Sequence, residues 1–190
     1  INNSREFFIL AYNKKSKQLI LSIKRLEYIR AWQRIKQIKQ EDLIMNLHIH
    51  TLNRGGLLTT IEGLQSFIPN SHISNIPKKE SLINTTIKSQ ILFIDEKNNK
   101  IICSHKRAIL NSLLPNIYIG KIITGIITKI YKYGLFIDIN GFLALLHISE
   151  LRDENLHNSH TFYIGNSISV QIIHIDTKQG RLSLSRRHIS

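Results

Sequence analysis

The chain has 190 residues with 26 Lys and Arg against 13 Asp and Glu, a net charge of +13. This charge predicts an anionic partner; nucleic acid is the first candidate and an anionic membrane surface is the alternative. No stretch approaches the roughly 18 consecutive apolar residues of a membrane span, so no membrane partner is expected, and the single cysteine, Cys103, excludes an intramolecular disulfide and a cysteine-based zinc site. The 36 Ile against one Val, together with 16 Asn, are typical of an AT-rich coding sequence such as an organellar genome.

Three segments of the chain end alike, which indicates an internal repeat. Each holds a polar turn and then an apolar strand that ends in a serine and basic residues. The segments are 13–25, 95–107 and 176–188, and their serines are Ser22, Ser104 and Ser185. We interpret each segment as the last hairpin of one unit. Residues 1–25 would then be the C-terminal hairpin of a truncated first repeat, whose other strands are expected upstream of Ile1.

A helix is predicted next, over residues 26–41. Apolar side chains recur there at steps of three and four residues, namely Tyr28, Ala31, Trp32, Ile35 and Ile38. This amphipathic pattern predicts a helical linker between barrels, within residues 26–44. We expect Trp32 to pack against a barrel rather than to stack on a base.

The second repeat is expected over residues 45–107, and a short linker over 108–116 follows it. Aligned to the third repeat without gaps, residues 55–58 match residues 133–136 at an offset of 78, whereas the terminal hairpins are offset by 81. We place the three extra residues in the loop between strands three and four, because loops absorb insertions and strands do not.

The third repeat, over residues 117–190, has five short runs with a β period, rich in Ile or Leu and bounded by Gly, Asn or a polar loop. The runs are 119–131, 135–139, 142–147, 168–175 and 181–185. Five strands without a long helical pattern predict a small closed barrel of the OB type, which can present one face to single-stranded nucleic acid. The predicted fold class is therefore all-β, with tandem five-stranded OB-fold barrels joined by a short helical linker.

Motifs in the third repeat resemble the S1-type RNA-binding domain, a five-stranded OB barrel. They are Gly120, Gly125, Tyr133-Gly134-Leu135-Phe136, Leu146-His147-Ile148-Ser149, and Asp176 with Arg181, Ser185, Arg186 and Arg187 at the end. In tandem, the repeats resemble the ribosomal protein S1 family, and their small number and AT-biased composition resemble its plastid form. The resemblance implies an RNA-binding component of the small ribosomal subunit that binds single-stranded mRNA and assists its recruitment for translation.

The resemblance also implies a set of RNA-contacting residues. They are Tyr133, Phe136, His147, Asp176 and Arg181, and we expect Lys132, Lys121, Arg186 and Arg187 to add delocalised attraction for phosphate. In a regular strand Tyr133 and Phe136 would lie on opposite faces, because they are three residues apart. A bend or bulge at Gly134 would bring both rings outward, and the alternative is Phe136 in the core.

Two of these residues have competing interpretations. His147 ends an apolar strand, so it is either a structural residue or one that stacks on a base or contacts phosphate. Asp176 repels phosphate, so it either caps its own turn or accepts a hydrogen bond from a base or a 2′-hydroxyl group.

The second repeat departs from the motif. Gly55, Leu58 and Pro69 occupy the positions that match Tyr133, Phe136 and His147, whereas basic residues remain. Residues 1–110 carry 18 Lys and Arg against 8 Asp and Glu, and the remainder carries 8 against 5. Our hypothesis is that the basic N-terminal part, with the first and second repeats, docks on the ribosome through its RNA or proteins, while the third barrel holds mRNA.

Other functions remain open at this point. The chain could be the S1-domain portion of an exoribonuclease or another RNA-processing protein, or a free RNA chaperone. The acidic residues are scattered and no phosphate-binding Gly-Lys loop is present, so we expect no catalysis and no cofactor. His48 and His50 could share one strand face, but no third ligand is near in sequence, so no metal site is expected. The expected location is the plastid ribosome, with the bacterial cytoplasm as the alternative.

Overall fold

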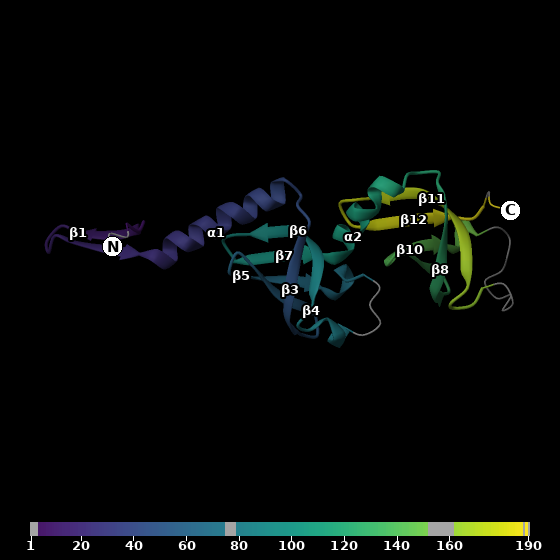
Figure 1. Ribbon diagram of the computed structural model, residues 1–190, viewed down its shortest axis with the longest axis horizontal. Helices are drawn as coiled ribbons and strands as arrows, with labels where there is room; N and C mark the ends of the chain where they lie inside the picture. Colours follow the sequence, from purple (N-terminus) through teal and green to yellow (C-terminus); the bar gives the residue numbers. More distant parts are fainter. Residues whose placement is uncertain (1–3, 75–78, 152–161, 188, 190) are drawn as a thin grey trace.

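A computed structural model describes residues 4–74, 79–151, 162–187 and 189. The elements follow one another along an elongated molecule (Figure 1). An N-terminal hairpin leads through a long helix into a middle barrel, and a short helix joins that barrel to the last one.

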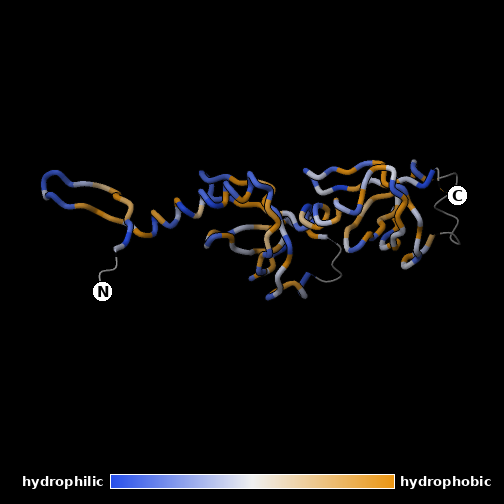
Figure 2. The backbone as a smooth tube through the Cα atoms, turned by 45° about the horizontal axis from the view of Figure 1, so that its top comes forward, coloured by the Kyte–Doolittle hydropathy of each residue, from blue (hydrophilic) through white to orange (hydrophobic). Residues whose placement is uncertain are grey.

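The N-terminal hairpin pairs β1 (Phe8–Asn13) with β2 (Gln18–Ser22) in a two-stranded antiparallel sheet. Its strands carry exposed apolar side chains. Figure 2 colours parts of both strands as hydrophobic residues. The predicted linker helix is α1 (Ile23–Gln40), which begins where the Ser22 hydroxyl accepts a hydrogen bond from the Arg25 backbone amide.

The apolar stripe of α1 packs into the core of the middle barrel. Trp32 is 1 % exposed, and Ile35 and Ile38 are buried in the same hydrophobic cluster as the barrel residues Ile49 and Leu57. Trp32 is thus a packing anchor, as predicted. The helix therefore fixes the N-terminal end of the middle barrel.

The middle barrel closes five strands in the order β3-β4-β5-β7-β6. The strands are β3 (Met45–Leu52), β4 (Gly56–Ile61), β5 (Leu64–Pro69), β6 (Thr86–Asp95) and β7 (Lys100–Ser104), with the 3₁₀ helices η1 (Asn70–His72) and η2 (Lys79–Leu82) between β5 and β6. Neighbouring strands are antiparallel except β5 and β7, where Phe67 pairs with Ile102 in parallel.

The last barrel repeats this plan in the order β10-β12-β11-β8-β9. Its strands are β8 (Ile122–Tyr131), β9 (Gly134–Ile139), β10 (Phe142–His147), β11 (Ser167–Asp176) and β12 (Arg181–Ser185), with the 3₁₀ helix η4 (Ile148–Glu150) after β10. The two closed barrels confirm the predicted fold class. Strands β4 and β9 are offset by 78 residues, and β6 and β11 by 81, so the insertion lies in the loop before β11, as predicted.

The linker over residues 108–116 forms regular structure that the sequence interpretation did not anticipate. It is occupied by helix α2 (His105–Leu113) and the 3₁₀ helix η3 (Leu114–Asn116). Helix α2 begins one residue after β7, because the Ser104 hydroxyl accepts from the Arg107 backbone amide. Leu110 on this helix is fully buried in the core of the last barrel, so α2 belongs to both barrels.

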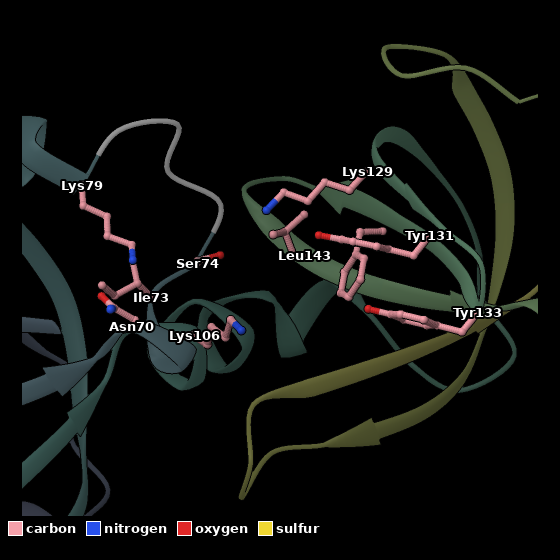
Figure 3. A pocket seen from close by; sticks show the side chains of 10 residues that line it. Asn70, Ile73, Ser74, Lys79, Lys106, Lys129, Tyr131, Tyr133 and Leu143 are labelled. Atoms are coloured by element: carbon pink, nitrogen blue, oxygen red, sulfur yellow. The ribbon is translucent and has the colours of Figure 1, made fainter. Parts of the chain in front are cut away.

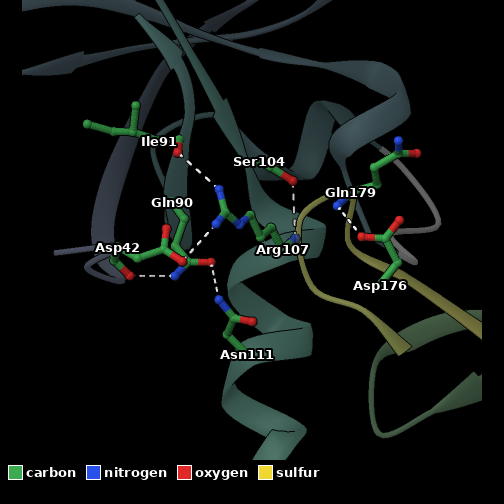
Figure 4. Close-up of polar contacts among 8 residues, drawn as sticks. All are labelled: Asp42, Gln90, Ile91, Ser104, Arg107, Asn111, Asp176 and Gln179. Atoms are coloured by element: carbon green, nitrogen blue, oxygen red, sulfur yellow. Dashed lines mark hydrogen bonds and ion pairs between the residues drawn. The ribbon is translucent and has the colours of Figure 1, made fainter. Parts of the chain in front are cut away.

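Polar contacts hold α2 on the middle barrel (Figure 4). The Arg107 guanidinium lies 2.7 Å from the Asp42 carboxylate, and its side chain is only 16 % exposed. Asn111 donates to the Gln90 side-chain oxygen at 2.8 Å, and the Gln90 amide donates to the Asp42 carbonyl at 2.7 Å. On the other side, a Cβ atom at Gly180 would lie 3.0 Å from the Arg107 backbone nitrogen. The turn between β11 and β12 therefore packs closely against the first turn of α2.

Candidate nucleic-acid interface

The β8–β9 hairpin turns through two residues, Lys132 and Tyr133, between the paired residues Tyr131 and Gly134. Gly134 has a φ of +154°, and a Cβ atom there would lie 2.4 Å from the Leu146 carbonyl oxygen. Only glycine fits this close approach of the hairpin to β10. The predicted bend or bulge is not at Gly134 itself, which pairs regularly with Tyr131 and His147. Tyr133 instead leaves the strand register because it lies in the turn directly before Gly134.

A β-bulge in β8 places the side chains of Lys129 and Tyr131 on the outer face of the barrel. The pairing with β9 shifts between Ile127, which is buried, and Lys129, which is exposed and pairs with Phe136. The extra residue, Thr128, donates its hydroxyl to the Phe136 carbonyl at 3.1 Å. Without the bulge, Lys129 and Tyr131 would share the inward face of Ile127. The bulge thus delivers both to the surface.

Three rings meet at this surface, and we call them the aromatic cluster: Tyr131, Tyr133 and Phe136. Tyr131 and Tyr133 stack with centroids 5.3 Å apart and planes within 6°. Phe136 stands edge-on to both, at 5.6 Å from Tyr131 and 6.4 Å from Tyr133. Tyr133 is 48 % exposed, whereas Phe136 is half-buried on the outer face of β9. Both predicted rings therefore lie outside the core.

Tyr131 was missing from the predicted site. Its position at the end of a strand, two residues from Tyr133, could have indicated it. The bulge that turns its side chain outward cannot, however, be recognised from the alternation of apolar and polar residues. A tyrosine directly before a two-residue turn is the feature that would have identified it.

His147 ends β10 directly opposite Gly134, so it borders the aromatic cluster. Its Nδ1 accepts from the Ser149 backbone amide at 3.2 Å and lies 2.8 Å from the Ser149 hydroxyl. These contacts fix the exposed ring and leave Nε2 as the nitrogen that can meet a ligand. Arg187 lies nearby, where its Nε donates to the Ser149 carbonyl at 2.7 Å, and it faces Glu150 at 3.7 Å.

Asp176 and Arg181 pair across the β11–β12 hairpin. The Asp176 carboxylate accepts from the Gln179 backbone amide at 3.0 Å, so it caps its own turn. Arg181 is exposed at the start of β12 and lines a hollow between the two barrels. Of this pair, the arginine is therefore the side chain that can contact phosphate.

Two predicted residues lie apart from the cluster. Lys121 precedes β8, at the opposite end of the strand from Tyr131, where its ammonium donates to the Asn116 carbonyl at 2.5 Å. Arg186 lies 5.6 Å from the centroid of the buried Phe162 ring. Lys132, by contrast, is exposed in the turn of the aromatic cluster itself.

The aromatic cluster opens onto a cleft of about 330 Å³ between the barrels (Figure 3). Its lining combines the three rings with Leu143 and Lys129 of the last barrel, and with Asn70, Ile73, Ser74, Lys79 and Lys106. The hydroxyl ends of Tyr131 and Tyr133 and the ammonium of Lys129 point toward the middle barrel. Stacking surfaces and positive charge therefore lie side by side, as in sites for single-stranded nucleic acid.

The matching hairpin of the middle barrel has no such cluster. The positions 78 residues before its three rings hold Asn53, Gly55 and Leu58. The Asn53 side chain accepts from the Gly55 amide at 2.9 Å, and the Phe67 ring lies 3.3 Å from where a Cβ of Gly55 would be. This turn is therefore closed by its own contacts.

The described part of the chain was predicted to hold no metal site, and His48 and His50 were the residues considered for one. The rings of His48 and His50 lie edge-on at 5.2 Å, and His50 Nε2 is 3.1 Å from the Thr60 hydroxyl. Within those residues no group of three or more His, Cys, Asp or Glu could hold a metal ion. Of the described helices, none combines the length and the apolar character needed to cross a membrane.

Comparisons with known proteins show which family the chain is similar to. Residues 117–187 match the family model of the S1 RNA binding domain. Over all 190 residues the chain is 50 % identical to small ribosomal subunit protein bS1c from Pyropia yezoensis and spans 72 % of that protein. It is 40 % identical over 186 residues to bS1 from Synechococcus sp., covering 97 % of this chain and 61 % of the relative. It is 32 % identical over 185 residues to bS1c from Spinacia oleracea, covering 97 % and 45 % respectively. These are the names of a ribosomal protein and not of a ribonuclease.

Proposed function

This chain belongs to the family of small ribosomal subunit protein bS1, and from that premise we propose that it works on the small ribosomal subunit of a plastid, where its last barrel holds single-stranded mRNA. The names of the relatives support the ribosomal assignment, and the suffix shared by the Pyropia and Spinacia proteins, with the Ile- and Asn-rich composition, supports the plastid. The S1 RNA binding domain matched over residues 117–187 supports RNA as the ligand.

The aromatic cluster is the observation that carries the mRNA proposal. Bases expose π faces that stack on aromatic rings for about 1–3 kcal/mol each, without regard to sequence. Tyr133 offers its outer face, and Phe136 and the fixed His147 ring border it. Lys132, in the turn of the cluster, and Arg181, in the hollow between the barrels, supply positive charge for the phosphate backbone. A site built in this way holds many different messages, as mRNA recruitment requires.

In this proposal the N-terminal part of the chain docks on the ribosome. The excess of 18 Lys and Arg over 8 Asp and Glu in residues 1–110 supports attraction to ribosomal RNA. The exposed apolar strands of the N-terminal hairpin offer a second kind of surface, for protein contacts. The last barrel, which carries less charge, remains available for mRNA.

A single experiment tests both the ribosomal assignment and the aromatic RNA site. The 190-residue chain is mixed with small subunits washed free of this protein, sedimented at moderate salt, and assayed for capture of a labelled single-stranded RNA. We expect the wild type to co-sediment and to increase RNA capture. The double variant Tyr133→Ala, Phe136→Ala should co-sediment equally but lose the captured RNA. Failure of the wild type to co-sediment would contradict the ribosomal assignment, and equal capture by the variant would contradict the aromatic site.

A further inference from the structure

Two clefts at the junction of the barrels share one lining residue, Lys106. The first cleft holds Lys106 together with Lys129 and the three rings. The second, of about 440 Å³, holds Lys106 together with His72 of the middle barrel and Arg181 of the last. Lys106 itself comes from helix α2 of the middle repeat, and in Figure 3 it faces the last barrel from across the cleft.

The residues on either side of Lys106 are held by hydrogen bonds and an ion pair. Ser104 caps the helix on one side of it, and Arg107 on the other is held by Asp42. The Ser104 hydroxyl also lies 3.0 Å from Nδ1 of His72, which ties the 3₁₀ helix η1 to the same point. Close packing of Gly180 against the Arg107 backbone brings Arg181 up to this junction. The positive groups are therefore assembled in the free protein rather than gathered by a ligand.

These groups repel one another. Burial, and then the charges of Arg181 and Lys129, lower the pKa of Lys106. Burial, and then the charges of Lys106 and Arg181, lower the pKa of His72. Among the described residues, neither set of cleft-lining side chains includes an Asp or a Glu. An assembled cationic site without a lining carboxylate is stabilised by an external anion, and a phosphate of RNA is the anion already expected next to the aromatic cluster.

We propose that an RNA strand stacked on the aromatic cluster continues into the cleft between the barrels, where Lys106 of the middle repeat binds its phosphate groups together with Lys129 and Arg181 of the last repeat. This inference rests on the proposed function, because it extends the same RNA site. It assigns an RNA contact to the middle repeat, although that repeat has no aromatic cluster of its own. The two barrels then form one composite site whose length exceeds that of the last barrel.

The test compares two lysine substitutions in the full chain. Lys106→Ala removes the proposed contact. Lys97→Ala removes the same charge from the β6–β7 turn, at the end of the middle barrel that adjoins α1, where the neighbouring Glu96 contacts Lys36 at 2.6 Å. Binding is measured for single-stranded RNAs of about 4 and about 12 nucleotides, which sample the range of OB-fold site sizes. Each titration is repeated at several salt concentrations.

We expect Lys106→Ala to weaken binding of the longer RNA about three- to tenfold at low salt and to reduce the slope of log K against log salt by about 0.7, the value for one single-strand phosphate contact. The shorter RNA should bind unchanged, and Lys106→Arg should bind both like the wild type. Lys97→Ala, on the far end, should alter neither the affinity nor the slope by a comparable amount.

Two results would overturn the inference while leaving the proposed function intact. One is equal behaviour of Lys106→Ala and Lys97→Ala on the longer RNA. The other is an equal loss on both RNA lengths, which would place Lys106 at the aromatic cluster rather than beyond it. Failure of the wild-type chain to bind either RNA would instead overturn the proposed function itself.

Discussion

Removal of two rings of the aromatic cluster is the most direct test of the RNA site. In the double variant Tyr133→Ala, Phe136→Ala, the exposed platform is lost while Tyr131 and the hairpin glycine remain. Tyr133 lies in a turn and is 48 % exposed, so its truncation leaves little unfilled space. Phe136 is half-buried, so its truncation also loosens packing against Tyr131, 5.6 Å away. Folding of the variant must therefore be checked by thermal denaturation.

The expected magnitude follows from the geometry of the rings. A fully available ring contributes about 1–3 kcal/mol per stacked base. Tyr133 presents such a face, whereas Phe136 presents only the part that its edge-on neighbours leave open. We therefore expect a total loss of roughly 2–4 kcal/mol, which corresponds to about a 30- to 700-fold weaker affinity for single-stranded RNA.

Fluorescence anisotropy with a labelled single-stranded RNA measures this loss. Stacking releases no counterions, so the loss should be nearly the same at low and moderate salt, unlike the loss from a lysine variant. Tyr118→Ala provides the matched control, since Tyr118 is 65 % exposed but precedes β8, at the other end of the barrel. An unchanged affinity in a folded double variant, or an equal loss in Tyr118→Ala, would refute the assignment.

Three further predictions concern stability, measured by chemical denaturation. Gly134→Ala should lower the free energy of unfolding by at least about 1–3 kcal/mol, because its φ is +154° and a Cβ would lie 2.4 Å from the carbonyl of the neighbouring strand; an unchanged midpoint would contradict this strain. Ser104→Ala should cost about 1 kcal/mol through loss of the α2 cap, and a loss below a few tenths would mean that the cap is dispensable. His105 is 8 % exposed and donates Nδ1–H to the Lys88 carbonyl, and its burial lowers its pKa from 6.5. The unfolded chain therefore takes up the proton first as pH falls below 6.5, so stability should be complete above that pH and decline below it. His105→Asn should reduce this decline, with His72 supplying the rest, and an unaltered pH profile would exclude His105 as its source.

Much of the fold could be predicted because the terminal hairpin recurs three times in the sequence and the barrel pattern twice. Alternating Ile and Leu mark the strands, and the matching serines at the end of each copy fix where the last hairpin stops. Helix α2 escaped prediction because its nine residues are too few for a clear helical period. Its start was nevertheless encoded, since Ser104 caps α2 in the way that Ser22 caps α1.

The site was only partly predictable. Tyr133, Phe136 and His147 followed from motifs, but their convergence depends on the close approach of Gly134 to β10, which is a contact between strands distant in sequence. Lys106 could not be found in this way. In the sequence it belongs to a basic pair after a serine and looks like an ordinary solvated lysine. Its place in the clefts depends on the packing of α2 against the last barrel, which the sequence does not reveal.

The basic pairs after the three serines show how one local motif acquires different roles. Arg107 forms an ion pair with Asp42 and so helps to hold α2 on the middle barrel, whereas its neighbour Lys106 lines the cleft between the barrels. In the last copy, Arg187 reaches back to the Ser149 carbonyl and Arg186 covers Phe162, so both anchor the end of the chain. The charge is the same in each copy, but Lys106 lies in a cleft whose other side is formed by a second barrel. Helix α2 places it there, and the absence of an aromatic cluster in the middle repeat is therefore compatible with a part in RNA binding.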